Sequence, residues 1–304
     1  MPIGCIQGAF TRSNPRIFAI MLSSAQFFKD RSLLIATKHG KELVIAPLLE
    51  AAFSLRCHTP TDYDTDLLGT FTGEVEREKD PLSTVREKAK RAAEEYKADL
   101  VLASEGSFGP HPSIFFVQAD EEWLLLYDAR HHHEIIVREI STHTNFNGQS
   151  ITSAAELESC AAKAGFPDHR LIIRNAAGSL AYIQKGIGDW GALTNAYKDC
   201  LLKYGTVYVE TDMRAMYNPS RLEVIRSVTE KLIEKMKSCC PACQIPGYGI
   251  VEALPGLLCS LCASPTRSTR AYVYGCTSCG HRNEAPFPHG KTAEDPMYCD
   301  QCNP

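Results

Sequence analysis

The chain has 304 residues, of which 44% are hydrophobic and 22% are charged, and its formal net charge is −4. This is the composition of a globular protein, with enough length for one medium domain and a small one. The slightly negative charge disfavours DNA, RNA and anionic membranes as partners. No apolar run in the sequence reaches the length needed to span a bilayer.

The first 30 residues carry Arg12, Arg16 and Lys29 but no acidic residue before Asp30. An acid-poor leader of this kind is found in transit peptides, but it is also typical of an extension ahead of a domain. We expect residues 1–30 to be a disordered extension. The 13 cysteines are not spread as in a secreted disulfide scaffold, which indicates a reducing compartment and a cytoplasmic location.

Strands and helices alternate from residue 32 to about residue 236. The predicted strands, in chain order, cover residues 32–36, 101–105, 123–127, 134–140, 171–173 and 207–209. The predicted helices cover residues 43–52, 83–96, 153–164, 190–204 and 219–236, with Ser83 and Ser153 as N-caps and Glu156 as the capping-box partner of Ser153. This alternation predicts an α/β domain over residues 31–237, in which helices flank a central mixed sheet.

The amino-acid composition changes near residue 238, after which Cys, Pro and Gly are frequent and there is almost no helical pattern. Residues 238–304 contain four CxxC pairs, namely Cys240/Cys243, Cys259/Cys262, Cys276/Cys279 and Cys299/Cys302. Zinc takes four tetrahedral ligands and each CxxC turn presents two thiolates, so the pairs predict a zinc-ribbon-like module with two structural zinc sites. Redox CxxC motifs usually stand alone at the start of a helix, and an iron–sulfur cluster is a further alternative.

The spacing of the pairs does not decide which of them share an ion. We expect sequential pairing, in which the first pair joins the second and the third joins the fourth, and an interleaved cross-brace is the alternative. Because all ligands are cysteines, neither ion has an open coordination position, and we interpret both zincs as structural.

Polar residues gather where predicted strands give way to helices. The segment ATKHGK places Thr37, Lys38, His39 and Lys41 at such a junction. Backbone N–H groups at a helix N-terminus bind anions, and the two lysines add positive charge, so this loop is a candidate phosphate site. The alternative is a solvated lysine turn.

Acidic residues form a second group. Glu105 ends an apolar strand inside a glycine turn, which places it at the carboxyl edge of an α/β sheet, where ligands bind. Gly106 would allow a ligand to approach the backbone. Glu74 and Glu76 could join Glu105 around Mg²⁺, which prefers carboxylates, water and phosphate oxygens. A solvated acidic loop is the alternative, and we prefer it for Asp62.

A third group lies in TDMRAMYNPSR, where Arg214 and Arg221 follow a strand and precede a helix. Arginine binds phosphate with two parallel hydrogen bonds, although a capping and salt-bridge cluster with Asp212 would use the same residues. In FPDHRLIIR, His169 and Arg170 could contact phosphate or act as acid–base groups. A turn role for His169 is the preferred alternative.

These motifs resemble the noncanonical purine nucleoside triphosphate (inosine triphosphate) pyrophosphatases. ATKHGKE is similar to their opening Ser/Thr-x-Asn-x-x-Lys, and EKAKRAAEEYKADLVLASEGSFG resembles their Lys- and Ala-rich helix with the acid-ended strand, closest to the branch with Glu-Gly-Gly. The match covers about residues 32–130. His39 stands where the family has asparagine, and Ser107 stands where it has the second glycine.

The resemblance implies an ITPase/Maf-like fold and Mg²⁺-dependent cleavage between the α and β phosphates of a nucleotide. It implies that Lys41 contacts phosphate and that Glu105 binds metal or activates water. It also implies that Arg214 or Arg221 takes the place of the basic residues that contact phosphate late in the family's sequences. From about residue 32, the whole layout also resembles an uncharacterised bacterial family with C-terminal CxxC pairs and no assigned activity.

We therefore expect a Mg²⁺-dependent nucleotide pyrophosphohydrolase with a structural zinc tail, whose partner is a nucleotide or another phosphorylated small molecule. The expected catalytic residues are Glu105, Lys41, Glu74 and Glu76, and the expected substrate-binding residues are Thr37, Lys38, His39, Gly106, Arg214 and Arg221. One alternative is a non-catalytic nucleotide sensor. The other is a zinc-ribbon adaptor that binds protein or nucleic acid. A homodimer is left open.

Overall fold

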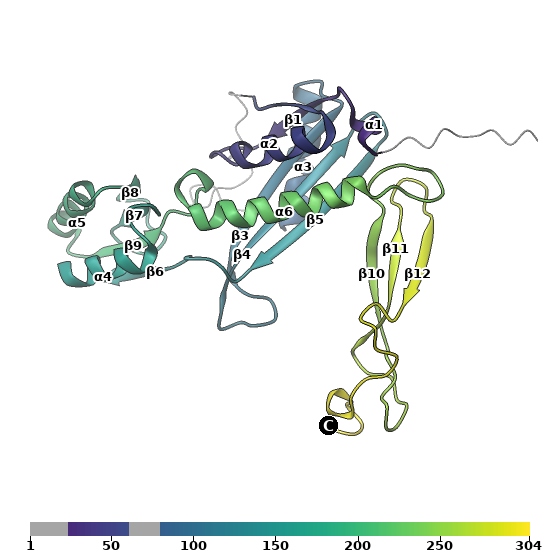
Figure 1. The fold of residues 1–304 in the computed structure, drawn as a ribbon. Coiled ribbons are helices and arrows are strands. Elements are labelled where there is room, and N and C mark those ends of the chain that lie inside the picture. Colours follow the sequence, from purple (N-terminus) through teal and green to yellow (C-terminus); the bar gives the residue numbers. More distant parts are fainter. Residues whose placement is uncertain (1–23, 61–79) are drawn as a thin grey trace, which may run out of the picture.

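The computed structural model describes residues 24–60 and 80–304 (Figure 1). Its helices are α1 (Ser24–Phe28), α2 (Glu42–Phe53), α3 (Pro81–Glu95), α4 (Ala154–Ala164), α5 (Trp190–Tyr204), α6 (Pro219–Lys237) and the short 3₁₀ helices η2 (Ala215–Tyr217) and η3 (Pro296–Tyr298). Its strands are β1 (Ser32–Ala36), β2 (Arg56–His58), β3 (Leu100–Pro110), β4 (Gln118–Asp128), β5 (His133–Ser141), β6 (Gly148–Ile151), β7 (Leu171–Arg174), β8 (Ile183–Ile187), β9 (Val207–Thr211), β10 (Gly249–Pro255), β11 (Thr269–Gly275) and β12 (Arg282–Pro286). Within these described ranges, no helix is both long and apolar enough to cross a membrane.

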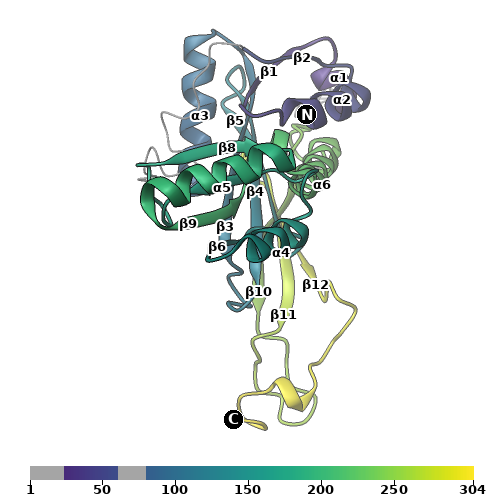
Figure 2. The same cartoon turned by 90° about the vertical axis from the view of Figure 1, so that its left-hand side faces the viewer.

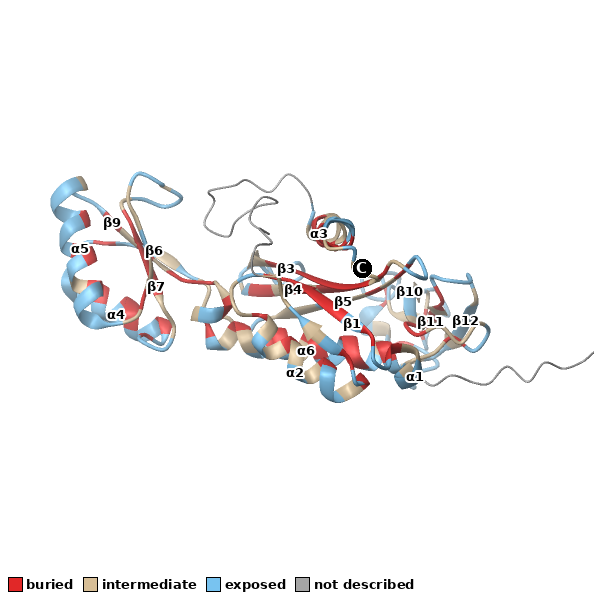
Figure 3. Cartoon of the chain, turned by 90° about the horizontal axis from the view of Figure 1, so that it is seen from above, coloured by how far each residue is buried: buried red, intermediate tan, exposed pale blue. Residues whose placement is uncertain are grey.

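Five strands form a mixed sheet in the order β2-β1-β3-β4-β5. β1 runs parallel to β2 and β3, whereas β3, β4 and β5 are antiparallel neighbours. Figure 3 shows α3 on one face of this sheet and α2 and α6 on the other. Successive strand residues face opposite sides, so Leu33 and Ile35 pack towards α2 and α6, and Leu34 packs towards α3. The expected central mixed sheet with flanking helices is confirmed.

The strand that contains Glu105 is longer than predicted. β3 continues to Pro110, and Glu105 lies opposite Trp123 of β4. β3 leaves its parallel partner β1 at Ala103 and goes on as one arm of a hairpin, in which β4 supplies the hydrogen bonds of the backbone. Glu105 therefore lies just past the carboxyl end of β1, but within a strand and not in a turn.

Four further strands form a second, antiparallel sheet in the order β6-β9-β7-β8. α4 and α5 pack on one face and bury a separate core that includes Leu171, Ile173 and Val209. Figure 1 shows this unit beside the five-stranded sheet, joined to it by the chain before β6 and after β9. The alternation of strands and helices in the sequence does not reveal that the strands form two separate sheets.

The helix starts follow ordinary capping chemistry. Asp80, and not Ser83, caps α3, because its carboxylate accepts a hydrogen bond from Ser83 N at 3.0 Å and Pro81 takes the first helical position. Ser153 caps α4 as predicted, and its oxygen accepts from Glu156 N at 3.2 Å.

The N-terminal segment is folded from residue 24 onwards. α1 lies where the sequence places a disordered extension, and its Phe28 is buried with its ring centroid 5.3 Å from that of Phe53. An aromatic side chain of this size removes much apolar surface from water, which ties the segment to the core. Residues 1–23 lie outside the described residues.

The cysteine-rich module begins directly after α6. β10, β11 and β12 form a three-stranded antiparallel sheet that extends from the rest of the molecule as an arm with the C-terminus at its tip (Figure 2). The base of the arm is fixed to β5 by His133, which is buried. Its Nε2 donates to the Pro246 carbonyl at 2.7 Å, and its Nδ1 lies 3.3 Å from Thr277 Oγ1.

Candidate functional site

The eight paired cysteines form two tetrads in the described part of the chain. Within each tetrad all four sulfurs lie within 4.8 Å of one another, and the tetrads are Cys240, Cys243, Cys276 and Cys279, and Cys259, Cys262, Cys299 and Cys302. The first CxxC pair therefore joins the third, and the second joins the fourth. The expected sequential pairing is wrong, and the interleaved cross-brace is the arrangement of this protein.

The topology of the arm explains the interleaving. Gly249 at the start of β10 lies opposite Gly275 at the end of β11, so the first and third CxxC pairs meet at one end of the sheet. The second pair follows β10 and the fourth follows β12, which brings them together at the other end. Seven residues of strand separate the first pair from the second by about 23 Å, too far for one ion.

The geometry of both tetrads fits zinc. Four sulfurs placed tetrahedrally at a Zn–S distance of about 2.3 Å are about 3.8 Å apart. The measured Sγ–Sγ distances are 3.7 and 3.6 Å in the first tetrad and 3.9 and 3.6 Å in the second. Backbone N–H groups of the turns point at the sulfurs, as Ala242 N does at Cys240 Sγ and Leu261 N at Cys259 Sγ, both at 3.4 Å. Four thiolates leave no open position, so these are sites for structural metal.

A second assembly, which we call the buried ion cluster, lies past the carboxyl end of β1. Its members are at most 7% exposed, and they are Lys41, Lys88, Glu105, Asp120, Glu122 and Arg221. Glu122 is its centre: Oε2 accepts from Lys41 Nζ at 2.9 Å, and Oε1 accepts from Arg221 Nε at 2.6 Å. Glu105 forms an ion pair with Lys88. The motifs that contain Lys41 and Arg221 thus meet on Glu122, and the charge of Glu105 acts on Lys41 from the other face of the sheet.

Local structure fixes each member of this cluster. Asp120 and Glu122 are two residues apart on β4 and so share the face that packs against α2 and α6. Lys41 stands at the start of α2, and Arg221 lies in the first turn of α6, where Asn218 caps the helix by accepting from Arg221 N at 3.1 Å. Glu105 points to the other face, towards α3.

The loop before α2 contacts the neighbouring elements through its backbone as well as through Lys41. Thr37 is buried and its Oγ1 lies 3.3 Å from Ser104 Oγ, whereas Lys38 is exposed. His39 has a φ of +69°, and its carbonyl accepts from Met216 N at 2.8 Å. The contact joins the ATKHGK segment to η2, so two of the predicted phosphate-binding segments are neighbours.

Gly106 lies against the buried ion cluster. A Cβ at this position would overlap Arg221 Nη2 and lie 2.6 Å from Glu122 Oε1. The absence of a side chain therefore makes room for the Arg221–Glu122 ion pair on the surface of β3.

Asp120 is the unusual acid of the cluster. It is completely buried, and neither carboxylate oxygen has a hydrogen-bond partner among the described residues. Burial, reinforced by the charge of Glu122, raises the pKa of Asp120 to about 8. Burial also lowers the pKa of Lys41 to about 8, against the opposing effect of Glu122.

The raised pKa of Asp120 predicts a pH dependence of stability. Between about pH 4 and pH 8 the folded chain keeps a proton on Asp120 that the unfolded chain has released, so the free energy of unfolding falls as pH rises. Asp120→Asn is neutral at every pH. We expect its stability relative to the wild type to increase by up to about 1.4 kcal/mol per pH unit in this window and to level off above it. Urea unfolding of both proteins at pH 5, 6, 7 and 8 measures this difference, and a constant difference would show that Asp120 titrates near its ordinary pKa.

Nothing in the described part of the chain supports the expected magnesium site. Glu105 and Glu122 are each engaged by cations of the protein, and the two cysteine tetrads are the only groups of three or more metal-ligating side chains that converge in residues 24–60 and 80–304. Glu74 and Glu76, which complete the expected carboxylate set, lie outside the described residues.

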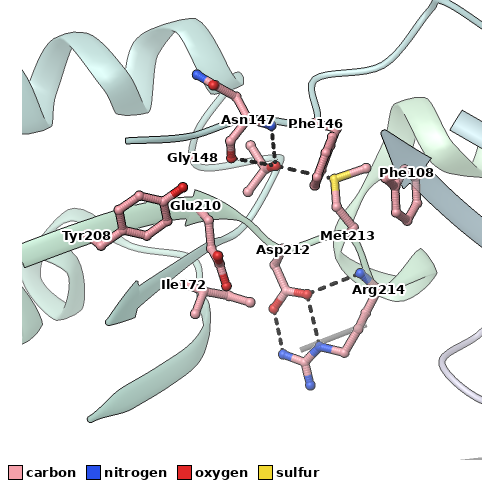
Figure 4. Close-up of a pocket in the computed structure, with 11 residues that line it drawn as sticks. Phe108, Phe146, Asn147, Gly148, Ile172, Tyr208, Glu210, Asp212, Met213 and Arg214 are labelled. Atoms are coloured by element: carbon pink, nitrogen blue, oxygen red, sulfur yellow. Dashed lines mark hydrogen bonds and ion pairs between the residues drawn. The ribbon is translucent and has the colours of Figure 1, made fainter. Parts of the chain in front are cut away.

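A cleft of about 110 Å³ opens between the two sheets, next to the buried ion cluster (Figure 4). Residues of both sheets and of the segments that join them form its wall, and they are Phe108, Phe146, Asn147, Gly148, Ile172, Tyr208, Glu210, Thr211, Asp212, Met213 and Arg214. Phe108 and Phe146 lie with ring centroids 5.5 Å apart. Arg221 stacks on the Phe108 ring, with Cζ 4.9 Å from its centroid, and donates to the Met213 carbonyl. Phe108 and Met213 thus separate the cleft from the cluster.

The two predicted arginines have different environments. Arg221 belongs to the buried ion cluster. Arg214 lies at the cleft and pairs with the fully buried Asp212, which accepts from Arg214 Nε at 2.9 Å and from Arg214 N at 3.1 Å. The capping and salt-bridge arrangement, considered as the alternative for this segment, is therefore present.

Several residues of this region carry no clear signal in the sequence. Lys88 is one of many charged residues in a helix, and the two phenylalanines have no motif. Asp120 and Glu122 have a signal, because a strand with acids on the same side as Leu124 and Leu126 places charge on a face that is otherwise apolar.

Comparisons with known proteins give a family but no activity. Among solved structures, the chain is similar to the crystal structure of protein VC0702 from Vibrio cholerae, with a TM-score of 0.29 and 9% sequence identity, over 66% of this chain and 91% of that chain. No curated protein matches the chain. A family model described as a domain of unknown function, DUF6671, matches residues 88–304, which include β3, β4, every residue of the cleft wall and the cysteine-rich arm. The chain therefore belongs to the DUF6671 family.

Proposed function

We propose that the chain binds a nucleotide or a related phosphorylated small molecule in the cleft between the two sheets and hydrolyses a phosphoanhydride bond in it. The observation that carries this proposal is the contact between an aromatic-lined cleft and a buried ion cluster, through Phe108 and Met213. The base of a nucleotide needs an aromatic-lined cleft, and its phosphate chain needs positive charge close to that cleft.

The cleft suits the flat part of such a ligand. Phe108, Phe146 and Tyr208 offer aromatic surface, and Ile172 contributes an apolar floor. Small-molecule sites are mostly apolar with a few polar groups that fix orientation. Asn147 could supply such a group here.

The phosphates would lie towards the start of α2. This 12-residue helix presents backbone N–H groups at its N-terminus, and the exposed Lys38 precedes it. Lys41 and Arg221 lie behind it as fixed positive charge, partly balanced by Glu122. Positive charge held in a low-dielectric environment stabilises the charge that develops on a leaving phosphate.

Hydrolysis adds water across one phosphoanhydride bond. The water oxygen bonds to phosphorus, the bridging oxygen leaves with pyrophosphate, and a carboxylate takes the proton of the water. We assign that proton to Glu105, which Lys88 holds at the carboxyl end of β1. Magnesium enters only as the ordinary counter-ion of a nucleoside triphosphate.

A nucleotide sensor without turnover is the second candidate. It is favoured by the pairing of Glu105 with Lys88 and of Glu122 with Lys41 and Arg221, because carboxylates already engaged by cations are less available to a metal or to water. The cleft and its ligand would be the same.

A panel of nucleoside triphosphates with Mg²⁺, assayed for pyrophosphate release, separates these candidates. We expect the wild type to release pyrophosphate from at least one of them, and Glu105→Gln to lower kcat by about 10²–10⁴-fold. Glu95→Gln, an exposed acid at the end of α3, is the matched control and should leave kcat unchanged. Binding without release would establish the sensor, and the absence of both binding and release would refute the proposal.

A further inference from the structure

A pair of arginines shares one tyrosine beside the cleft. Arg170 stands directly before β7, and Arg214 stands directly before η2. Both guanidinium groups lie on the ring of Tyr217, with Cζ 5.2 Å from the ring centroid for Arg170 and 4.6 Å for Arg214. The proposed function makes no use of Arg170.

The negative charge nearby balances only one of these arginines. Asp212 is fully buried and accepts from Arg214 N, Nε and Nη2 and from Gly186 N. Its hydrogen-bonding capacity is thereby filled. Over the described ranges no carboxylate forms an ion pair with Arg170, whose guanidinium donates once, from Nη1 to the Gly186 carbonyl at 3.3 Å. A half-buried guanidinium therefore keeps most of its N–H donors unused by the protein.

The backbone holds Arg170 in this position. Arg170 N donates to the Tyr217 carbonyl at 3.0 Å, and the Arg170 carbonyl accepts from Asp212 N at 2.9 Å. The guanidinium lies against the backbone of Gly188, where a Cβ would overlap Nη1 and Cζ and lie 2.9 Å from Nε. A guanidinium fixed between a tyrosine ring and a glycine backbone loses little freedom when it binds an anion.

We propose that Arg170 is the centre of an oxyanion site that takes a phosphate group. The planar guanidinium can donate two parallel hydrogen bonds to two phosphate oxygens, and the charge of Arg170 supplies the attraction. Tyr217 and Gly188 shape the site, and Arg214 connects it to the cleft, which it also lines. The site stands without the proposed hydrolysis, because none of its members belongs to the buried ion cluster.

Titration of inorganic phosphate against the full chain, in a phosphate-free buffer of low ionic strength, tests the site. We expect saturable binding by the wild type and a loss of affinity of about tenfold or more in Arg170→Gln. Gly188→Ala keeps the charge of Arg170 but displaces its guanidinium, and we expect a similar loss. Arg267→Gln, at an exposed arginine paired with Asp300, is the charge-matched control and should bind like the wild type.

Two results would overturn the proposal. One is the absence of phosphate binding by the wild type. The other is unchanged affinity in both Arg170→Gln and Gly188→Ala, with circular dichroism showing that the variants are folded. The use of two variants with different chemistry protects the test against one of them failing to fold.

A competition experiment between a nucleotide and inorganic phosphate decides whether the phosphate group belongs to the cleft ligand or is free phosphate. If a nucleotide that binds the cleft displaces inorganic phosphate, the group is part of the cleft ligand, whereas simultaneous binding assigns the site to free phosphate. Failure of the proposed function would appear as no nucleotide binding and would leave the phosphate titration unaffected. Failure of the Arg170 site would appear in the phosphate titration alone.

Discussion

Replacement of Cys243 and Cys276 together by serine is expected to remove one zinc ion per chain and to leave the other in place. Both residues belong to the same tetrad, so the tetrad of Cys259, Cys262, Cys299 and Cys302 remains intact. Replacement of Cys243 and Cys262 together is expected to remove both ions, because each tetrad then loses one ligand. Elemental analysis of the purified full chain gives the zinc content.

These two variants discriminate between the pairings because sequential pairing predicts the reverse result. The expected effect is large, because structural zinc binds zinc-finger peptides with an apparent free energy on the order of 10–16 kcal/mol. This binding free energy drives the folding of the turns that hold the ion. Cys239→Ser is the matched control, since Cys239 precedes Cys240 but belongs to neither tetrad, and it should retain both ions. Retention of one ion by the Cys243/Cys262 variant would contradict the interleaved arrangement.

Replacement of Glu122 by glutamine is expected to lower the free energy of unfolding by about 3–5 kcal/mol. Glu122 is fully buried and is the partner of both Lys41 and Arg221, so its loss removes a shared negative charge from two buried cations. Lys41→Met should cost less, because Arg221 still balances Glu122. Urea unfolding at neutral pH measures both changes.

The control for this prediction is an exposed ion pair. Glu234 and Lys237 form such a pair on α6, and Glu234→Gln should change the free energy of unfolding by less than about 0.5 kcal/mol. Equal, small effects of Glu122→Gln and Glu234→Gln would mean that the buried ion cluster is open to water and that the burial described for it is wrong.

The elements with strong periodic patterns were predictable from the sequence. β1, α3, α5 and α6 each show apolar residues at the spacing of one secondary structure, and these residues are buried in the cores of the structure. β8 was not, because Gln184, Lys185 and Gly186 give it no alternating pattern and its stability comes from pairing with β7. Local pattern also cannot assign strands to one sheet or two, since that depends on which strands pair.

The candidate site was predictable in part. Lys41, Glu105 and Arg221 were singled out because their motifs lie at predicted strand ends, where ligands bind in α/β sheets, although Glu105 lies within β3 and Arg221 follows a strand of the second sheet. Glu122, on which two of these side chains converge, lies inside a strand and has no motif. The zinc ligands were identified by spacing, but the pairing of the CxxC turns follows from the register of β10 and β11, which the sequence does not state.

Calorimetric titration of the nucleoside triphosphate panel tests most directly whether the cleft between the two sheets binds a nucleotide. Asn147 is exposed and lines the cleft, so Asn147→Trp should fill it without disturbing the buried ion cluster. Gln149, also exposed but outside the cleft wall, gives the matched control Gln149→Trp. We expect the wild type and Gln149→Trp to bind the same nucleotide, and Asn147→Trp to bind it about tenfold more weakly or not at all. Equal binding by Asn147→Trp and the wild type, or no binding by the wild type, would show that the cleft is not a nucleotide site.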